Sequence, residues 1–464
     1  MWYEFRMRLS SLLGPDLRAV LESDPESLRD ALEEFHAEDI AEILGDLEPA
    51  DRVALMQVLT PELAASVMER ISPEQQVSFL RAISAADGAQ VLSEMDPDDL
   101  VDVLQELEHE ERAPLLTELE RFDVEAAEEA RELVLYGPET AGGLMTTEYV
   151  ALPPQTKVWE AIEAVRRAAD EGEVESIYYV YVCGYGEKLL GVVSLRDLIL
   201  GDPGQELEHV MTEKVVHVGP LDDQEKVADI IARYDLSAVP VVDSDFALLG
   251  MVTVDDVVDV VIEEATEDAQ MMAGMMPLED SYFATGLFEF VWKRGVWLVL
   301  LFLGQLLTAT VMEVNQLTLQ RTMELALFIP LIISSGGNVG SQSSTLIIRA
   351  LAIGEIESAD WLRVVTRELS VGFLLGLVLG AMGFLRGYIA GDTVAPWALA
   401  AVVSTSILAI VVLSAVVGSV LPLVIKRAGL DPAVSSTPFI ASVVDVLGLM
   451  VYFGIAQYVF SMTA

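Results

Sequence analysis

One carboxylate lies inside the last long apolar stretch of the chain. Asp445 stands in the segment SVVDVLGLM, with apolar residues on both sides. Placing a lone carboxylate at the centre of a membrane helix costs about 2.5–3.5 kcal/mol on insertion scales, so the group needs water, a cation or a partner helix. The other apolar stretches offer no Lys or Arg at the same depth. Asp445 is therefore predicted to hold a cation, and a carboxylate satisfied by a neighbouring helix is the alternative.

A second acidic residue, Asp431, immediately precedes Pro432 at the start of the same stretch. Asp before Pro is a common helix N-cap, because the carboxylate accepts backbone N–H groups and proline suits the first turn. A metal ligand at this position is an equally good interpretation, and the sequence leaves both open.

Two Gly-x-x-Ser/Thr-x-x-Asp elements have the composition of a nucleotide site. They are GVVSLRD at 191–197 and GMVTVDD at 250–256. A hydroxyl at a helix start can face a phosphate group, and a carboxylate can accept the ribose hydroxyls. Ser or Thr is also an ordinary N-cap where a strand turns into a helix. These elements therefore predict either nucleotide binding or simple capping.

The charge of the chain limits its partners. It carries 74 acidic and 27 basic residues, for a formal net charge of −47, although 52% of its residues are hydrophobic. The acidic residues crowd into the part before residue 285, and such an excess repels a phosphate backbone, so we expect no nucleic-acid partner. Cations are the favoured partners. Salt adaptation of the whole surface is the alternative for any single carboxylate outside the motifs.

The sequence does not indicate an enzyme. It shows no activated nucleophile, and His36, His109, His209 and His217 form no evident ligand cluster. The single cysteine, Cys183, excludes an internal disulfide, which suits a reducing cytosol. The N-terminus has no apolar core of signal-peptide length, so we expect the soluble part to stay on the side of synthesis.

The elements that must position these residues change along the chain. Short apolar segments recur through residues 28–120, each with apolar residues three and four apart, which predicts short helices. Helices this short must stack to bury a face, so residues 1–140 are predicted to form an acidic superhelical domain. The segments begin at Asp39, Asp51, Glu62, Gln75, Asp87, Asp98 and Glu111.

Two similar α/β units are predicted next, at 145–203 and 204–262. The first contains SIYYVYV and LLGVVSLRDL, and the second contains SAVPVVD and LLGMVTVDDV. The segment 255–285 follows, and its first part is typical of an amphipathic acidic helix. We expect this helix to connect the α/β units to the apolar part of the chain.

A membrane domain is predicted at 290–464. Each of five apolar stretches is long enough to cross about 30 Å of hydrocarbon. The expected spans are 295–312, 323–350, 369–390, 397–425 and 435–461. The run SSGGN at 334–338 interrupts the second span, so we expect a broken helix there that lines a cavity or packs closely.

The basic residues predict the orientation of the spans. Most of them flank the ends assigned to the cytoplasm, and only Arg321 and Arg386 fall in the two opposite loops. Positive charge favours the cytoplasmic side, so the N-terminal domains are expected inside and the C-terminus outside. The cytoplasmic set is Lys293, Arg294, Arg349, Arg363, Arg367, Lys426 and Arg427.

With these parts in this order, the chain resembles the MgtE family of magnesium channels. The resemblance covers nearly all of the sequence, and it identifies the two α/β units as a tandem pair of CBS domains. The fold it implies is an α-helical superhelical N-terminal domain, the CBS pair, a connecting (plug) helix and a five-helix transmembrane domain. The most specific matches are IYYVYV, GVVSLRDLILGDP, GMVTVDDVVDV, EEATED, GGNVGSQSSTLIIRAL and DPAVSSTPF.

The resemblance implies a homodimeric channel of the inner (cytoplasmic) membrane, with a pore at the interface of the two membrane domains. Asp445 matches the aspartate that holds a hydrated Mg²⁺ ion in that pore. The plug helix closes the pore when cytoplasmic Mg²⁺ binds between acidic domain faces. By motif position the further metal ligands are Asp223, Glu225, Asp235, Asp256, Asp259, Glu264, Glu267 and Asp268. Asp98 or Asp99 of the N-terminal domain is an additional candidate.

The CBS pair of the family can also bind ATP. Tyr179, Arg196 and Asp197 occupy the matching positions here. Leu236 departs from the pattern, because it stands where a relative has an aromatic side chain against adenine, and leucine stacks less well.

Two other functions stay open on the sequence. A secondary transporter that couples a divalent ion to Na⁺ or H⁺ also needs an intramembrane carboxylate, although the five spans show no convincing inverted repeat. A membrane receptor that reports nucleotide or metal levels needs no charge at Asp445. The gated Mg²⁺ channel is therefore the preferred hypothesis.

Overall fold

The structure is a computed structural model. It describes residues 25–463 except 46, 172, 173, 175, 176, 279–281, 283, 284 and 391–395. The chain forms two compact units, residues 1–262 and 263–464, and each is described by itself. The first 24 residues of the predicted N-terminal domain, and part of the predicted connecting segment after residue 278, lie outside the described residues.

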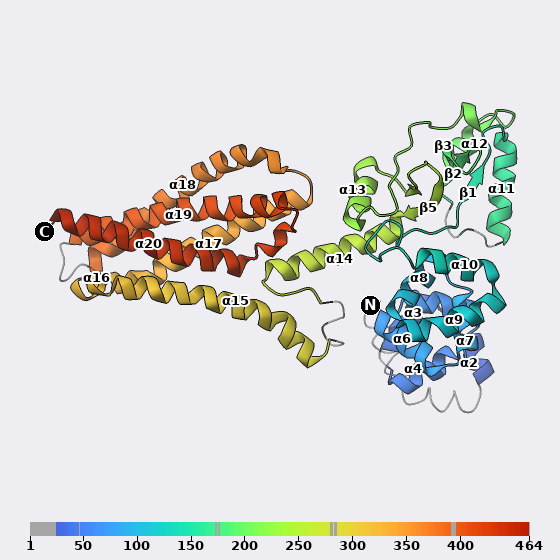
Figure 1. The fold of residues 1–464 in the computed structure, drawn as a ribbon, viewed down its shortest axis with the longest axis horizontal. Helices are drawn as coiled ribbons and strands as arrows, with labels where there is room; N and C mark the ends of the chain where they lie inside the picture. Colours follow the sequence, from blue (N-terminus) through green and yellow to red (C-terminus); the bar gives the residue numbers. More distant parts are fainter. Residues whose placement is uncertain are drawn as a thin grey trace. The chain divides into compact units, whose positions relative to one another are not determined.

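The first unit begins with a series of short stacked helices, as the repeat predicts (Figure 1). Thr60 caps one of them, because its hydroxyl accepts a hydrogen bond from the Leu63 N–H at 3.4 Å. The helices bury their apolar faces in one core that includes Ile40, Leu55 and Leu104. The helices are α2 (Pro25–Leu32), α3 (Ala37–Gly45), α4 (Pro49–Met56), α5 (Pro61–Met68), α6 (Pro73–Ala82), α7 (Ala85–Leu92), α8 (Pro97–Glu106), α9 (His109–Phe122) and α10 (Val124–Leu133).

The first α/β unit holds a three-stranded sheet in the order β1-β2-β3. Strand β1 pairs parallel with β2, and β2 pairs antiparallel with β3. The strands are β1 (Val150–Leu152), β2 (Tyr179–Cys183) and β3 (Leu189–Ser194), and the helices are α11 (Val158–Glu171), α12 (Leu195–Leu200) and the 3-10 turn η1 (Leu207–His209).

The second α/β unit repeats this topology. Strands β4 (Ala238–Val242) and β5 (Leu248–Thr253) pair antiparallel, and Val218 adds a parallel bridge to Val241 in the place that β1 takes in the first sheet. Helix α13 (Gln224–Tyr234) precedes the strands, and α14 (Val254–Met272) follows them. Val101 of α8 joins the apolar core of this unit, so the helical domain packs on it.

The second unit is a bundle of long helices in which α17 to α20 lie side by side (Figure 1). Glycines let the backbones approach closely. A Cβ atom added at Gly376 of α18 would lie 2.7 Å from Leu408 Cδ1 of α19. The elements are α15 (Leu287–Val314), α16 (Gln316–Arg321), α17 (Glu324–Ala352), η2 (Ser358–Asp360), α18 (Trp361–Ala390), α19 (Pro396–Arg427), η3 (Pro432–Val434) and α20 (Thr437–Thr463).

Within the described residues, four helical stretches are long and apolar enough to cross a membrane. They are 287–314, 358–390, 396–427 and 437–462. The predicted second span forms α17, which is not among the four because polar residues occupy its middle.

The expected break in that span is wrong, because α17 runs without interruption from Glu324 to Ala352. The small residues of the SSGGN run serve close packing instead of a break. A Cβ atom at Gly336 would lie 2.8 Å from Val444 Cγ1 of α20 and 2.9 Å from Ile410 Cγ2 of α19. Glycine is therefore required where α17 is pressed between these two helices.

Candidate functional site

Asp445 lies in the interior of the helical bundle, on α20, with 8% of its surface exposed. Its Oδ2 atom accepts a hydrogen bond from Gln305 Nε2 of α15 at 3.0 Å. Its Oδ1 atom faces α17, where a Cβ atom added at Gly337 would lie 3.9 Å away. Two neighbouring helices, α15 and α17, therefore flank the carboxylate.

The partner of Asp445 is neutral. Among the described residues the hydrogen bond from Gln305 is the one contact of this carboxylate to a polar donor, and no ion pair joins it. The neighbouring helix α15 thus provides a hydrogen bond to Asp445 but no opposite charge. An amide donor offsets some of the desolvation but leaves the negative charge uncompensated, so the site still favours a cation.

A group of carboxylates lies in the helical domain where α5 ends and α8 begins. One oxygen from each of Glu69, Asp96 and Asp99 lies within 4.8 Å of the others. Burial, together with the charges of Glu69 and Asp102, raises the pKa of Asp99 to about 8. Burial and Asp96 likewise raise the pKa of Glu69, although its neighbour Arg70 opposes this. Such crowding is relieved when a divalent cation binds.

A second pair of neighbouring carboxyl groups, Asp98 and Asp256, lies within the first unit. Burial and the negative charge of Asp256 raise the pKa of Asp98. Burial also raises the pKa of Asp256 to about 6, although the hydrogen bond from the Thr253 hydroxyl works in the opposite direction. The sequence left Asp98 and Asp99 as alternatives. The structure places both in this acidic region, because consecutive residues in the first turn of α8 face different neighbours.

A third acidic group lies in the second unit. Burial and the charges of Asp431 and Glu264 raise the pKa of Asp268, while Arg349 opposes this rise. Asp431 also accepts a hydrogen bond from the Ala433 N–H at 2.8 Å and thereby caps η3. The two interpretations of Asp431 are compatible, because one carboxylate oxygen can cap a turn while the residue still faces other acids.

The other predicted metal ligands lie at the ends of α13 and along α14. Asp223 caps the start of α13 and accepts a hydrogen bond from the Glu225 N–H, whereas Asp235 ends that helix with a left-handed φ of 54°. An 11-residue helix separates them, a distance of about 16 Å. Asp259 is exposed on α14, and Glu267 is half-buried nearer its end. Metal binding by these five residues stays a prediction.

A cavity of about 290 Å³ lies between the two α/β units. Tyr179, Asp197 and Leu236 line it, as predicted for a nucleotide site, and Arg196 is not among the lining residues. Ser194 also lines it, with its hydroxyl 2.6 Å from Asp197 Oδ2 and accepting from the Asp197 N–H. Capping and ligand binding therefore compete for the same hydroxyl.

Two lining residues of this cavity were missed by the sequence reasoning. Lys214 supplies a positive charge, and Tyr234 supplies an aromatic ring two residues before Leu236. The signal for both was weak, because neither belongs to the paired Gly-x-x-Ser/Thr-x-x-Asp elements. A cation for phosphate and a ring for stacking are what a nucleotide needs.

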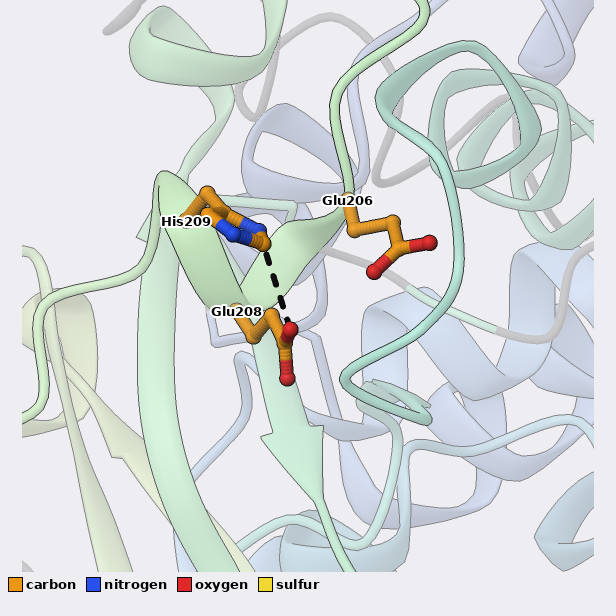
Figure 2. A group of neighbouring side chains, drawn as sticks. All are labelled: Glu206, Glu208 and His209. Atoms are coloured by element: carbon orange, nitrogen blue, oxygen red, sulfur yellow. Dashed lines mark ion pairs between the residues drawn. The ribbon is translucent and has the colours of Figure 1, made fainter.

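A further group of metal-ligating side chains lies at η1, where His209 and Glu208 stand side by side and Glu206 lies beside them (Figure 2). His209 Nδ1 is 3.7 Å from Glu208 Oε1. The tight turn brings two glutamates beside His209, a grouping that the positions of the four histidines in the sequence did not predict. Both side chains of the pair are about half exposed, at 59% and 43%, so water competes for these ligands.

Models of known protein families match three parts of the chain. The MgtE intracellular N domain matches residues 35–139, and the CBS domain matches residues 141–202 and 207–263. The model of MgtE itself, described as a divalent cation transporter, matches residues 329–455.

Whole relatives give the same result. The magnesium transporter MgtE of Thermus thermophilus is 40% identical over 335 residues, 72% of this chain and 73% of that protein. The magnesium transporter MgtE of Bacillus subtilis is 34% identical over 336 residues, with the same coverage. A crystal structure of the soluble part of a magnesium transporter is 35% identical, with a TM-score of 0.50 over 56% of this chain and 99% of that one.

Long apolar helices that follow an acidic helical domain and a CBS pair define a multi-pass membrane protein of the transport class, not an enzyme. The identity to curated relatives over most of their length makes the assignment specific. The chain belongs to the MgtE family.

Proposed function

We propose that this chain is an Mg²⁺ channel of the inner membrane, through which magnesium enters the cell, and that cytoplasmic Mg²⁺ closes it. The observation that carries the proposal is Asp445, a buried carboxylate on a membrane-length helix with a neutral amide as its described partner. Magnesium is the ion of choice because the relatives that cover most of the chain are magnesium transporters.

The ion binds Asp445 through its own water shell. Mg²⁺ releases water reluctantly, so a carboxylate that accepts hydrogen bonds from coordinated water is the contact it takes most readily. The chain acts as a homodimer, in which two copies of Asp445 face a pore between the two membrane domains. Binding there must be weak enough for the ion to leave, which suits a contact through water.

The crowded carboxylates supply the gate. In the absence of metal, the carboxyl groups around Asp99 repel one another, and so do those of Asp98 and Asp256. Mg²⁺ removes this repulsion, and it binds more tightly to the compact arrangement than to the open one. Cytoplasmic Mg²⁺ therefore shifts the population toward the closed state, with α14 as the plug helix, Asp268 on that helix and Asp431 on the side that receives it. Magnesium uptake is then limited by the Mg²⁺ that has already entered the cytoplasm. The additional ligands in this proposal are Asp223, Glu225, Asp235, Asp259, Glu264 and Glu267.

Flux into liposomes that contain the purified full chain tests this function. With Mg²⁺ outside and no gradient of Na⁺ or H⁺, we expect Mg²⁺ to enter and to be reported by an internal indicator dye. Mg²⁺ on the side of the soluble domains should stop the entry. Entry that requires an imposed Na⁺ or H⁺ gradient would instead support a coupled secondary transporter.

We also propose that ATP binds in the cavity between the α/β units. All four residues of the proposed contacts line this cavity: in this proposal Tyr179 and Tyr234 contact the base, Asp197 the ribose and Lys214 the phosphates. Leu236→Phe should tighten ATP binding about three- to ten-fold, since an aromatic pair adds about 0.5–1.5 kcal/mol beyond its buried area. Calorimetric titration measures this. Asp197→Asn should weaken binding, and unchanged affinity in both variants would place ATP elsewhere.

A further inference from the structure

Gln305 brings an amide into an apolar part of α15, in which Thr308 and Thr310 are the other polar residues. It lies in the middle of α15, and its neighbours Leu303, Leu306 and Leu307 are exposed apolar residues suited to lipid. An amide in hydrocarbon is costly unless its N–H and C=O groups find partners. The hydrogen bonds of the Gln305 amide offset this cost.

The amide of Gln305 reaches across to α20 and meets two residues there. Nε2 donates to Asp445 Oδ2 at 3.0 Å and makes a longer contact with Ser442 Oγ at 3.5 Å. The Ser442 hydroxyl itself donates to the Pro438 carbonyl at 3.0 Å. The short, charge-assisted contact to Asp445 is thus the principal interaction of the amide.

Gln305 also decides which oxygen of Asp445 is free. With Oδ2 held, Oδ1 is left toward α17, where Gly337 has no side chain to cover it. Among the described residues none donates a hydrogen bond to Oδ1. One oxygen is therefore fixed by the protein, and the other is available to accept from a coordinated water molecule.

We propose that Gln305 is a positioning residue for ion binding: its amide holds the carboxylate of Asp445 in the rotamer that turns Oδ1 toward the ion. This inference rests on the proposed function, because it assigns Gln305 a part in the same ion site. A fixed carboxylate binds hydrated Mg²⁺ without first losing side-chain freedom, so Gln305 raises the affinity of the site.

Two substitutions test this role in liposomes that contain the full chain. Gln305→Met keeps the length and bulk of the side chain but removes the N–H donor. Gln305→Asn keeps an amide that is too short to reach Asp445. Both should raise the external Mg²⁺ concentration that gives half-maximal flux by about ten-fold, the loss expected when one charge-assisted hydrogen bond is removed. The maximal flux should stay within about two-fold of the unsubstituted chain, because the carboxylate itself is intact.

A matched control removes a different polar group from the same helix. Thr310 is exposed and its hydroxyl donates to the Leu306 carbonyl within α15, so Thr310→Val should leave half-saturation unchanged. A structural role for Gln305 would lower the amount of working protein, and hence the maximal flux, with half-saturation unchanged; that result overturns the proposal. So does a Gln305→Asn variant with wild-type half-saturation, which would show that only polarity matters. No flux from the unsubstituted chain would count against the proposed function instead.

Discussion

Among the described residues, Asp445 in the second unit forms no ion pair and receives one hydrogen bond from the neutral Gln305. The carboxylates around Asp99 in the first unit crowd one another instead, and burial with nearby negative charge raises the pKa of Asp99 to about 8. Both regions are acidic and partly buried. They differ in how many negative charges share the space and in whether a neutral donor holds them.

This difference matches two tasks. A site on an ion route must bind and release repeatedly, so one carboxylate with a neutral partner gives a shallow well. A sensor must change the structure when the ion leaves, so several carboxylates that repel one another are suitable. The comparison predicts that substitution of Asp445 alters Mg²⁺ transport itself. Substitution among the carboxylates around Asp99 should instead alter the stability of the chain and the dependence of that stability on metal.

The largest effect is expected at Asp445. Asp445→Asn keeps the shape of the side chain but removes its charge, so Mg²⁺ flux into liposomes should fall at least about 100-fold. The matched control is Glu313→Gln, which removes an exposed carboxylate near the end of α15 and should leave flux unchanged. Normal flux through the Asp445→Asn variant would remove the distinction between the two regions.

A smaller effect is expected at Asp99, where substitution should stabilise the metal-free chain. Asp99→Asn removes a carboxyl group that the folded chain keeps largely protonated near neutral pH, because its pKa is about 8, at a cost of roughly 2 kcal/mol or more after allowance for residual solvent. The melting temperature of the metal-free chain, followed by circular dichroism, should therefore rise, and its increase on adding Mg²⁺ should shrink.

The control for Asp99→Asn is Glu110→Gln, because Glu110 is exposed on α9 and lies outside the acidic group. If Asp99→Asn instead lowers the stability of the metal-free chain, then protein groups already stabilise the Asp99 carboxylate without a cation, and the proposal of a metal site there is wrong.

The smallest effect is expected from pH. A carboxyl group with a raised pKa in the folded state stabilises the fold fully below its unfolded pKa, and this contribution is lost as pH rises through the folded value. For Asp99 the loss falls between about pH 4 and about pH 8. The metal-free chain should thus melt at lower temperature as pH rises over this range, and saturating Mg²⁺ should flatten the decline. A melting temperature that rises with pH would contradict the crowding argument.

Much of the fold could be predicted from the sequence, because the signals are local. Apolar residues three and four apart gave the short helices, and proline or a capping residue marked starts such as that of α5 at Pro61. The topology of the paired α/β units follows from their repeated motifs. The prediction failed at α17, where a run of small and polar residues indicates a break, yet packing against α19 and α20 keeps the helix continuous.

For the candidate site, the sequence by itself determined that Asp445 is exceptional, because a charge within an apolar run is costly wherever the helix packs. It also determined the acidic character of α8 and α14. Only the tertiary structure decided the partners: Gln305 lies 140 positions before Asp445, and Asp98 meets Asp256 from a different domain. Hydrogen bonds and charge repulsion act over a few ångströms in space, and one sequence does not carry the distances that folding creates.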